Sequence, residues 1–313
     1  MQPFDYLNTT TGLIWTVICI PSGFLLTALG YLLLNRIPAT WLCDYNETPS
    51  EELLSGKRFR YLRGWGIPIS IVMSVCLVLC RLQFNKGYTI YFILLSLIIF
   101  TGILIAISDF KYQIIPDQFT IAIGILALAV SVYDLVRGFH ILHSAWWSPL
   151  AGAGIGAAVM ILIDLIGMLV YHREGMGFGD VKLFFAVGIL TGFPGTIYAF
   201  IISILTATVC FVLVIAVSKI LHRNDEAQTD EAVPASETPE DEPAPEQQTQ
   251  PEDKKDDEAA EDTEQASEEP DEKGVGFTSY LAFGPYIAIA ICAYCALFDA
   301  IQYLAGLYLH LFN

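Results

Sequence analysis

The sequence predicts an all-α fold, namely a polytopic helical membrane protein with about eight transmembrane helices and a disordered acidic cytoplasmic insertion. Hydrophobic residues make up 54% of the 313 residues, which is more than a soluble domain carries. Apolar runs of about 20 residues recur, and each is long enough to cross a hydrocarbon core of about 30 Å as a helix. Helices are expected because lipid offers no partner for unpaired backbone groups. Acidic residues concentrate in one segment that has almost no apolar residues.

The apolar runs place the helices in order along the chain. Residues 1–10 contain no Lys or Arg, so the positive region of a secretory signal is missing and the first run is expected to remain as a membrane helix. The segment after Asp180 is short and is broken by Gly192 and Pro194. The predicted helices are 12–34, 66–81, 88–107, 118–136, 147–171, 181–193, 195–221 and 280–309.

Four parts follow from this reading. Residues 1–87 are expected to form N-terminal membrane helices with a cytoplasmic loop, and 88–223 a catalytic membrane core. Residues 224–273 are the acidic insertion. Residues 274–313 are expected to supply a C-terminal membrane helix that completes the core.

Positive residues predict the orientation, because cytoplasmic loops are enriched in Lys and Arg. The 35–66 loop holds five of them, and placing it in the cytoplasm also places 108–117, 172–180 and 222–279 there. The opposite side keeps Arg81, Lys86 and Arg137. This alternation puts Asp109 and Asp180 on one face of the membrane. The five residues of the loop are Arg36, Lys57, Arg58, Arg60 and Arg63.

The acidic insertion accounts for the net charge. Residues 224–273 hold 21 Asp and Glu and three Lys, so the rest of the chain is nearly neutral although the total is −17. A segment of this composition cannot offset its chain entropy by burial, so we expect a disordered, solvated tether. The chain has no basic patch, and nucleic-acid binding is therefore not expected.

Two carboxylates occur in matching settings. One carboxylate, Asp180, follows three glycines at the start of a membrane segment, in the run Gly175-Met176-Gly177-Phe178-Gly179-Asp180-Val181-Lys182. Because glycine permits close approach of the backbone, this run predicts a tightly packed turn that places Asp180 at the beginning of the helix. Upstream, Asp109 ends an apolar helix, and Pro116-Asp117 opens the next one. Two such carboxylates can share a proton and activate a water. Asp109 and Asp180 are thus the candidate catalytic pair, with Gly177, Gly179, Lys182, Pro116 and Asp117 as candidate supporting residues.

Other acids compete with this pair. Asp117 also fits a first-turn acid favoured by the helix dipole. Asp164 lies inside an apolar helix and reads as a structural hydrogen-bonding acid, and Asp134 and Asp299 are weaker candidates. Lys182 either extends to the lipid headgroups or acts on the charge of the aspartate pair, and the sequence leaves both open.

Metal and redox chemistry are not expected. Cys292-x-x-Cys295 lies in an apolar run and is read as packing. The histidines show no metal-ligand spacing, so the predicted metal site is none. Gly152-x-x-x-Gly156 is a helix-packing pattern.

Four of these stretches resemble one family in the same order. Ser22-Gly23-Phe24-Leu25 with Asn35-Arg36-Ile37-Pro38, the segment Asp109 to Asp117, Gly177 to Leu183, and Ala282-Phe283-Gly284-Pro285-Tyr286 are similar to the motifs of type IV prepilin peptidases. These enzymes are membrane aspartic proteases with a GxGD motif. Many of them carry two CxxC pairs with a structural zinc in the first loop, whereas Cys43 is the cysteine of that loop here, so no zinc is implied.

The resemblance implies an activity, partners and a location. The expected substrates are type IV prepilin or pseudopilin precursors, cut between a basic leader and an apolar helix at the cytoplasmic face of the inner (cytoplasmic) membrane. Proteolysis requires no cofactor. Many members also methylate the new N-terminus with S-adenosylmethionine, which would be the cofactor of that second activity alone.

Two alternatives stay open at this point. A presenilin-like intramembrane protease also uses GxGD, but its first aspartate follows a Tyr and its late motif is PAL, whereas this chain has Ser108-Asp109 and Phe283-Gly284-Pro285. A transporter or membrane scaffold would use Asp109 and Asp180 as ion ligands, and such proteins often show internal repeats.

Overall fold

The computed structural model describes most of the chain outside the acidic segment. Within the described residues the chain is helical and contains no strand. The described residues are 10–43, 49, 51–54, 58–61, 65–83, 88–138, 141–143, 145–171, 177–229 and 283–311. The insertion from 230 to 273, the loop residues Lys57 and Arg63, and His140 and His172 lie outside them.

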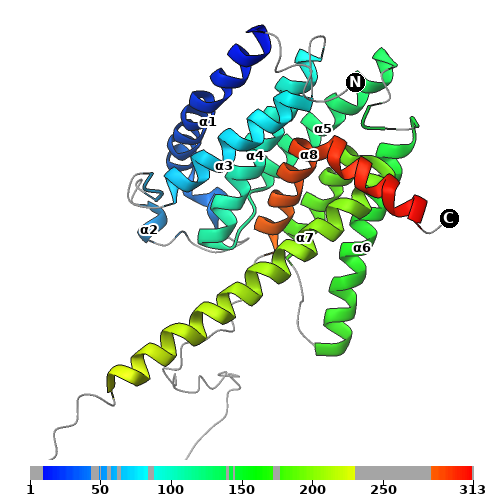
Figure 1. Cartoon of the computed structure of the whole chain (residues 1–313). Coiled ribbons are helices and arrows are strands. Elements are labelled where there is room, and N and C mark those ends of the chain that lie inside the picture. Colours follow the sequence, from blue (N-terminus) through cyan, green and yellow to red (C-terminus); the bar gives the residue numbers. More distant parts are fainter. Residues whose placement is uncertain are drawn as a thin grey trace, which may run out of the picture. The chain divides into compact units, whose positions relative to one another are not determined.

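Seven long helices and two short ones make up the described chain (Figure 1). Seven segments of these helices are long and apolar enough to cross a membrane, which confirms the predicted polytopic helical fold. The long helices are α1 (Thr10–Arg36), α3 (Gly66–Gln83), α4 (Thr89–Tyr112), α5 (Asp117–Arg137), α6 (Ser148–Tyr171), α7 (Phe178–Thr229) and α8 (Gly284–Leu311), and the short ones are the 3-10 helix η1 (Ala39–Leu42) and α2 (Glu51–Leu54).

The predicted helices 181–193 and 195–221 are the two sections of α7. The backbone leaves helical geometry at Gly192, with φ 59° and ψ −176°, and at Phe193. Gly192 tolerates this positive φ because it has no Cβ, and Pro194 has no N–H to continue the helical pattern. The interruption that the sequence predicted is therefore present. α7 also runs eight residues past the predicted helix end at 221, since adding a residue to an existing helix costs far less than starting one. The first residues of the predicted disordered insertion, 224–229, are therefore helical.

The chain divides into two compact units. The first comprises residues 1–213 and 282–313, and the second comprises 214–281. The described part of the second unit is the end of α7, up to Thr229. The first unit contains the predicted N-terminal helices and residues 88–213 of the predicted core, and the division of the chain at residue 87 stays a prediction.

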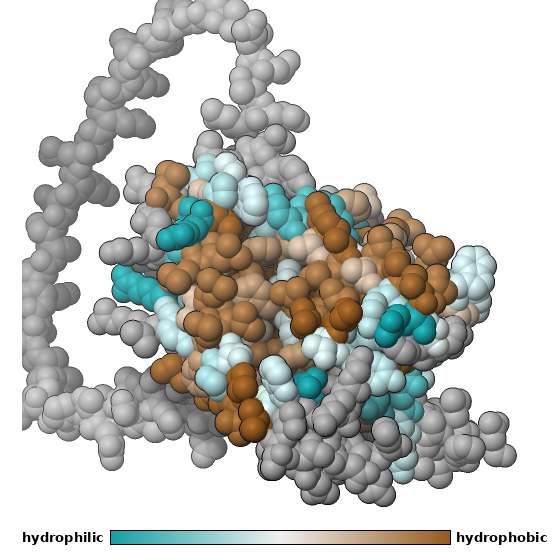
Figure 2. All heavy atoms as spheres, turned by 90° about the horizontal axis from the view of Figure 1, so that it is seen from above, coloured by the Kyte–Doolittle hydropathy of each residue, from teal (hydrophilic) through white to brown (hydrophobic). Residues whose placement is uncertain are grey.

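Helix α4 lies at the centre of the first unit, packed against α1, α3, α5 and α8 (Figure 1). Its side chains from Leu95 to Ile107 are largely buried. The outward faces of the helices carry many exposed Leu, Ile, Val and Phe, and apolar residues cover much of the face seen in Figure 2. Such a surface suits a lipid environment.

Close backbone contacts join pairs of helices at glycines. A Cβ at Gly23 of α1 would lie 2.6 Å from Ser74 Cα of α3. A Cβ at Gly152 of α6 would overlap the Gly188 carbonyl oxygen of α7, and one at Gly156 would lie 2.8 Å from the Phe184 carbonyl oxygen. The Gly152-x-x-x-Gly156 pattern thus packs α6 against α7, as predicted from the sequence.

We expect Gly152→Ala to lower thermal stability and Gly154→Ala to leave it unchanged. The new methyl group at 152 meets backbone atoms that cannot rotate away, and overpacking of this kind costs about 1–3 kcal/mol. A Cβ at Gly154 meets nothing within 4 Å. The midpoint of thermal unfolding in detergent is the measurement, and equal midpoints for both variants would contradict this packing.

Candidate active site

The two predicted catalytic aspartates lie together at one end of the helices. Asp109 is in the last turn of α4, and Asp180 is in the first turn of α7. Their side chains are 3% and 7% exposed, and the charges of the two carboxyl groups interact. The structure therefore brings together, and buries, two acids that are 71 positions apart in the sequence.

The first turn of α8 completes this group. The backbone N–H of Gly284 hydrogen-bonds to the Asp109 carboxyl. A Cβ at Gly284 would overlap Asp109 Oδ2 and lie 2.8 Å from Ile115 Cδ1, so only glycine allows α8 to begin this close to the carboxyl. Ile115 also lies against Gly179, because a Cβ added at Gly179 would be 3.4 Å from the Cβ of Ile115. The segments around 109–117, 177–182 and 283–286 thus meet at one place.

The glycines before Asp180 contribute less than the sequence suggested. A Cβ at Gly177 would meet nothing within 4 Å, and at Gly179 the contact with Ile115 is only moderately tight. Neither residue has a positive φ. The reason is that α7 begins at Phe178, so Gly179 and Asp180 occupy an ordinary first helical turn. The close approach predicted for this run occurs instead at Gly284.

Helix ends shape the electrostatics of the site. Gln113 adopts a left-handed conformation, with φ 55°, and its N–H bonds to the Asp109 carbonyl, which ends α4. Pro116 then directly precedes α5, as predicted. The beginnings of α7 and α8 both adjoin the aspartates, and helix N-termini carry partial positive charge. This arrangement favours a negative charge shared by the two carboxyls.

Each carboxyl keeps one oxygen available. Asp109 Oδ2 and Asp180 Oδ1 are buried and have no hydrogen-bond partner among the described residues. A buried carboxyl oxygen without a partner is costly, so such atoms mark strain, function or an unseen water. Two of them on neighbouring acids are what a bound water or a reacting carbonyl would require.

Lys182 is engaged away from the aspartate pair. Its Nζ lies 2.9 Å from both carboxylate oxygens of Asp117 and 5.0 Å from the centre of the Phe178 ring. The sequence left open whether this lysine extends to headgroups or acts on the catalytic acids, and the structure shows a third arrangement. Lys182 ties the first turn of α7 to the first residue of α5, which gives Asp117 a supporting role.

The remaining candidate acids lie elsewhere. Asp134 is at the end of α5, about 26 Å along the helix from Asp117 at 1.5 Å per residue. Asp164 is half-buried in α6, and the backbone N–H of Asp299 in α8 donates to Gln83 at the end of α3. None of the three is among the groups that surround Asp109 and Asp180 in the described structure.

Comparison with known proteins bears on the segment that holds both aspartates. Residues 94–212 match the model of the type IV leader peptidase family. The chain is also 34% identical over 88 residues to a prepilin leader peptidase/N-methyltransferase of Escherichia coli strain K12. That alignment covers 28% of this chain and spans 36% of the relative's length. No solved structure matches the chain.

The loop that follows α1 packs against the last turn of α4, next to Asp109. The Asn35 amide pairs with the backbone N–H and carbonyl of Phe59, at 2.8 and 2.9 Å. The Phe59 ring packs edge-on against Tyr112 at the end of α4, and Lys111 Nζ donates to the Arg58 carbonyl. Asn35, singled out as part of a motif, therefore fixes this loop beside the last turn of α4. Sequence reasoning missed Phe59, because its partners are distant in the chain.

The loop does not display a cofactor site. The Asn35 amide bonds to Phe59, and the buried Arg58 guanidinium donates to the carbonyls of Leu53 and Ile37. Among the described residues of this loop, no buried polar side-chain atom lacks a partner. The polar side chains of these described residues are thus used in holding the loop together. Within the described residues there is also no group of three potential metal ligands.

We expect the Lys182–Asp117 pair to stabilise the protein modestly. Both side chains are about one-third exposed, and ion pairs of this kind contribute roughly 0.2–1 kcal/mol. A double-mutant cycle with Asp117→Asn and Lys182→Met, read by thermal unfolding in detergent, should give a coupling energy within that range. A coupling energy of zero would show that the ion pair does not contribute to the free energy of unfolding.

Proposed function

We propose that this protein is a membrane aspartic endopeptidase that removes the basic leader of type IV prepilin-like precursors. The observation that carries the proposal is the pair of buried carboxyls, Asp109 and Asp180, each with an oxygen that has no partner among the described residues. The match of residues 94–212 to the type IV leader peptidase family supports the assignment, since both acids lie within it.

The chemistry follows from the shared charge. Two neighbouring carboxyls ionise together only at high cost, so one is ionised while the other is protonated. The ionised acid takes a proton from water as the water oxygen bonds to the scissile carbonyl carbon. The protonated acid donates its proton to the carbonyl oxygen. Collapse of the resulting intermediate breaks the C–N bond, and a proton passes to the leaving amine.

The helix termini suit the position of the scissile bond. In the proposed substrate the bond joins a basic leader to an apolar helix, so it lies where the chain enters the membrane. Asp109 ends one candidate span and Asp180 begins another. With the 35–66 loop on the cytoplasmic side, both acids face the cytoplasm, and the protein is placed in the inner membrane. The alternation of spans and the positive residues support this orientation.

Substitution of either acid tests the activity. Asp109→Asn and Asp180→Asn should each abolish leader cleavage, because a shared-proton mechanism needs both carboxyls. Cleavage of a prepilin with a basic leader and an apolar helix, followed in membranes by the size shift of the product, is the measurement.

Isosteric changes at acids outside the pair are the controls. Asp117→Asn should keep most of the activity, because the partly exposed ion pair that it forms with Lys182 contributes only roughly 0.2–1 kcal/mol. Asp164→Asn should cleave like the unmodified protein. Full activity in either variant of the pair, at normal membrane levels, would remove the proposed mechanism.

Reporter fusions test the orientation. Fusions after Arg63, Phe110 and Asn224 should read as cytoplasmic, and a fusion near His143 should read as external, because Lys and Arg concentrate in the 35–66 loop. An external signal at Phe110 would separate the aspartates from a cytoplasmic leader and would refute the topology.

A further inference from the structure

The break in α7 leaves backbone groups that a continuous helix would have paired. In a regular helix the Ile189 carbonyl accepts from the N–H of Phe193. Here the Phe193 N–H donates to Ser148 Oγ at 3.0 Å instead. Ile189 thus keeps a buried carbonyl without its usual donor, and in an apolar surrounding such a group needs another one.

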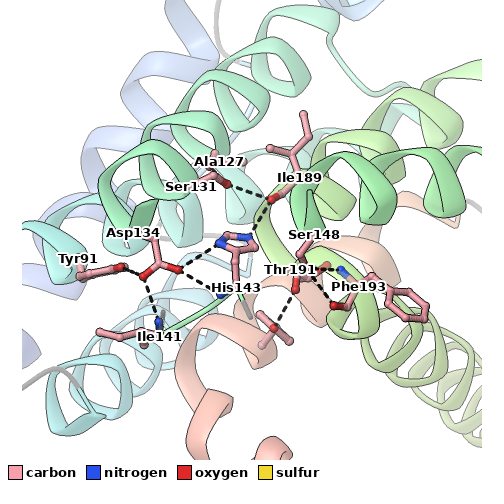
Figure 3. A network of polar contacts seen from close by, with 11 residues as sticks. Tyr91, Ala127, Ser131, Asp134, Ile141, His143, Ser148, Ile189, Thr191 and Phe193 are labelled. Atoms are coloured by element: carbon pink, nitrogen blue, oxygen red, sulfur yellow. Dashed lines mark hydrogen bonds and ion pairs between the residues drawn. The ribbon is translucent and has the colours of Figure 1, made fainter. Parts of the chain in front are cut away.

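Side chains from several helices supply the missing partners (Figure 3). The Ile189 carbonyl lies 3.2 Å from His143 Nε2 and accepts from Ser131 Oγ of α5, also at 3.2 Å. Ser148 of α6 donates to the Phe193 carbonyl at 2.9 Å. The Thr191 carbonyl accepts from the Tyr294 hydroxyl of α8 at 3.2 Å. The break is therefore bound on three sides rather than free to flex.

The fit at the break is close. A Cβ at Gly192 would lie 2.5 Å from Ser148 Oγ and 2.7 Å from His143 Cδ2. Since a carbonyl can only accept, His143 Nε2 carries the proton in its contact with Ile189. The ring must therefore be held in one orientation for this contact to persist.

Asp134 anchors the loop that carries His143, and its carboxylate lies beside the ring at Nδ1, which makes no hydrogen bond among the described residues. Its Oδ2 lies 3.4 Å from His143 Nδ1 and accepts from the His143 backbone N–H at 3.1 Å. Its Oδ1 accepts from the Ile141 N–H at 3.0 Å and from the Tyr91 hydroxyl of α4. Asp134 and His143 are 2% and 5% exposed. Both carboxylate oxygens are thus used as acceptors, a pattern that an amide cannot reproduce.

We infer that Asp134 and His143 are positioning residues that, through the Ile189 carbonyl, set the rotation and height of the first section of α7 and so the place of Asp180. That section, Phe178–Thr191, is about 21 Å long at 1.5 Å per residue. Near the aspartates, the Lys182–Asp117 ion pair ties this section to α5. At its other end, the Ile189 carbonyl contacts Ser131 of α5 and His143. We call the group formed by Ser131, Asp134, His143 and Ile189 the joint. A rotation at Ile189 would turn Asp180 away from Asp109.

The joint does not touch the reacting groups. Ile189 is nine residues from Asp180, which is about 14 Å along the helix. Substitutions in the joint should therefore lower kcat without changing KM. If the joint only stabilised the fold, the same substitutions would lower only the amount of folded protein. The cleavage part of this expectation rests on the proposed function, so the test also needs a readout that does not.

The experiment compares Asp134→Asn and Ser148→Ala with Ser203→Ala. Asparagine has the shape of aspartate but turns one acceptor into a donor. Ser148→Ala removes the hydroxyl at the break with little change in size, so it decides the question if Asp134→Asn does not fold. Ser203 is a matched control, since it is buried in the second section of α7 and bonds only within its own helix, to the Ala199 carbonyl.

Spin labels at positions 110 and 178 report the geometry without catalysis. Phe110 and Phe178 are 73% and 69% exposed and adjoin Asp109 and Asp180, and the partly exposed Cys43, Cys76 and Cys210 are replaced by alanine. In Asp134→Asn and Ser148→Ala the label-to-label distance distribution should broaden or shift. Their kcat should fall about tenfold to a hundredfold, the loss expected for misplacement by about 1 Å. Ser203→Ala should match the unmodified protein in both measurements.

The outcomes separate the two proposals. Unchanged label distances in folded Asp134→Asn or Ser148→Ala would overturn the positioning role, even if cleavage fell. Changed distances together with an absence of cleavage in the unmodified protein would leave the joint standing and reject the proposed function.

Discussion

Two carboxyl groups have to remain buried and close together where the end of α4 meets the beginnings of α7 and α8, and much of the structure serves this constraint. Burial of a charge is costly unless nearby groups stabilise it. Here the stabilising groups are two helix N-termini and the Gly284 N–H. Because these are backbone groups, they lower the cost of one negative charge without adding a cation that would neutralise it.

The lysine that lies closest to Asp180 in the sequence does not neutralise this charge. Lys182 is only two residues from Asp180, yet its ammonium group is held by both oxygens of Asp117. Two residues correspond to roughly half a turn of helix, so Asp180 and Lys182 face different neighbours. The lysine therefore fixes α7 to α5 while the aspartate interacts with Asp109 of α4. An acid that resembled a catalytic candidate in the sequence thus acts as the partner of a lysine.

Helix α5 is the element that contacts both ends of the first section of α7. Its first residue binds Lys182, and its last turns provide Ser131 and Asp134 at the break of α7. The interruption at Gly192 could have been a weak point in an apolar environment, because it frees backbone groups that lipid cannot satisfy. Buried hydroxyls and an imidazole satisfy them instead, which turns the interruption into a fixed attachment.

The sequence by itself determined the helical class, the approximate spans and the break near Gly192 and Pro194, and it singled out the two acids that the fold brings together. Each of these depends on local pattern: the length of apolar runs, residues that cannot continue a helix, and short motifs at helix ends. It did not reveal the role of Asp117 or the joint formed by Asp134 and His143, and it assigned the close backbone approach to Gly177 and Gly179 rather than to Gly284. Those features depend on which helix faces meet across large sequence separations, and only the tertiary packing of α4, α5, α7 and α8 decides that.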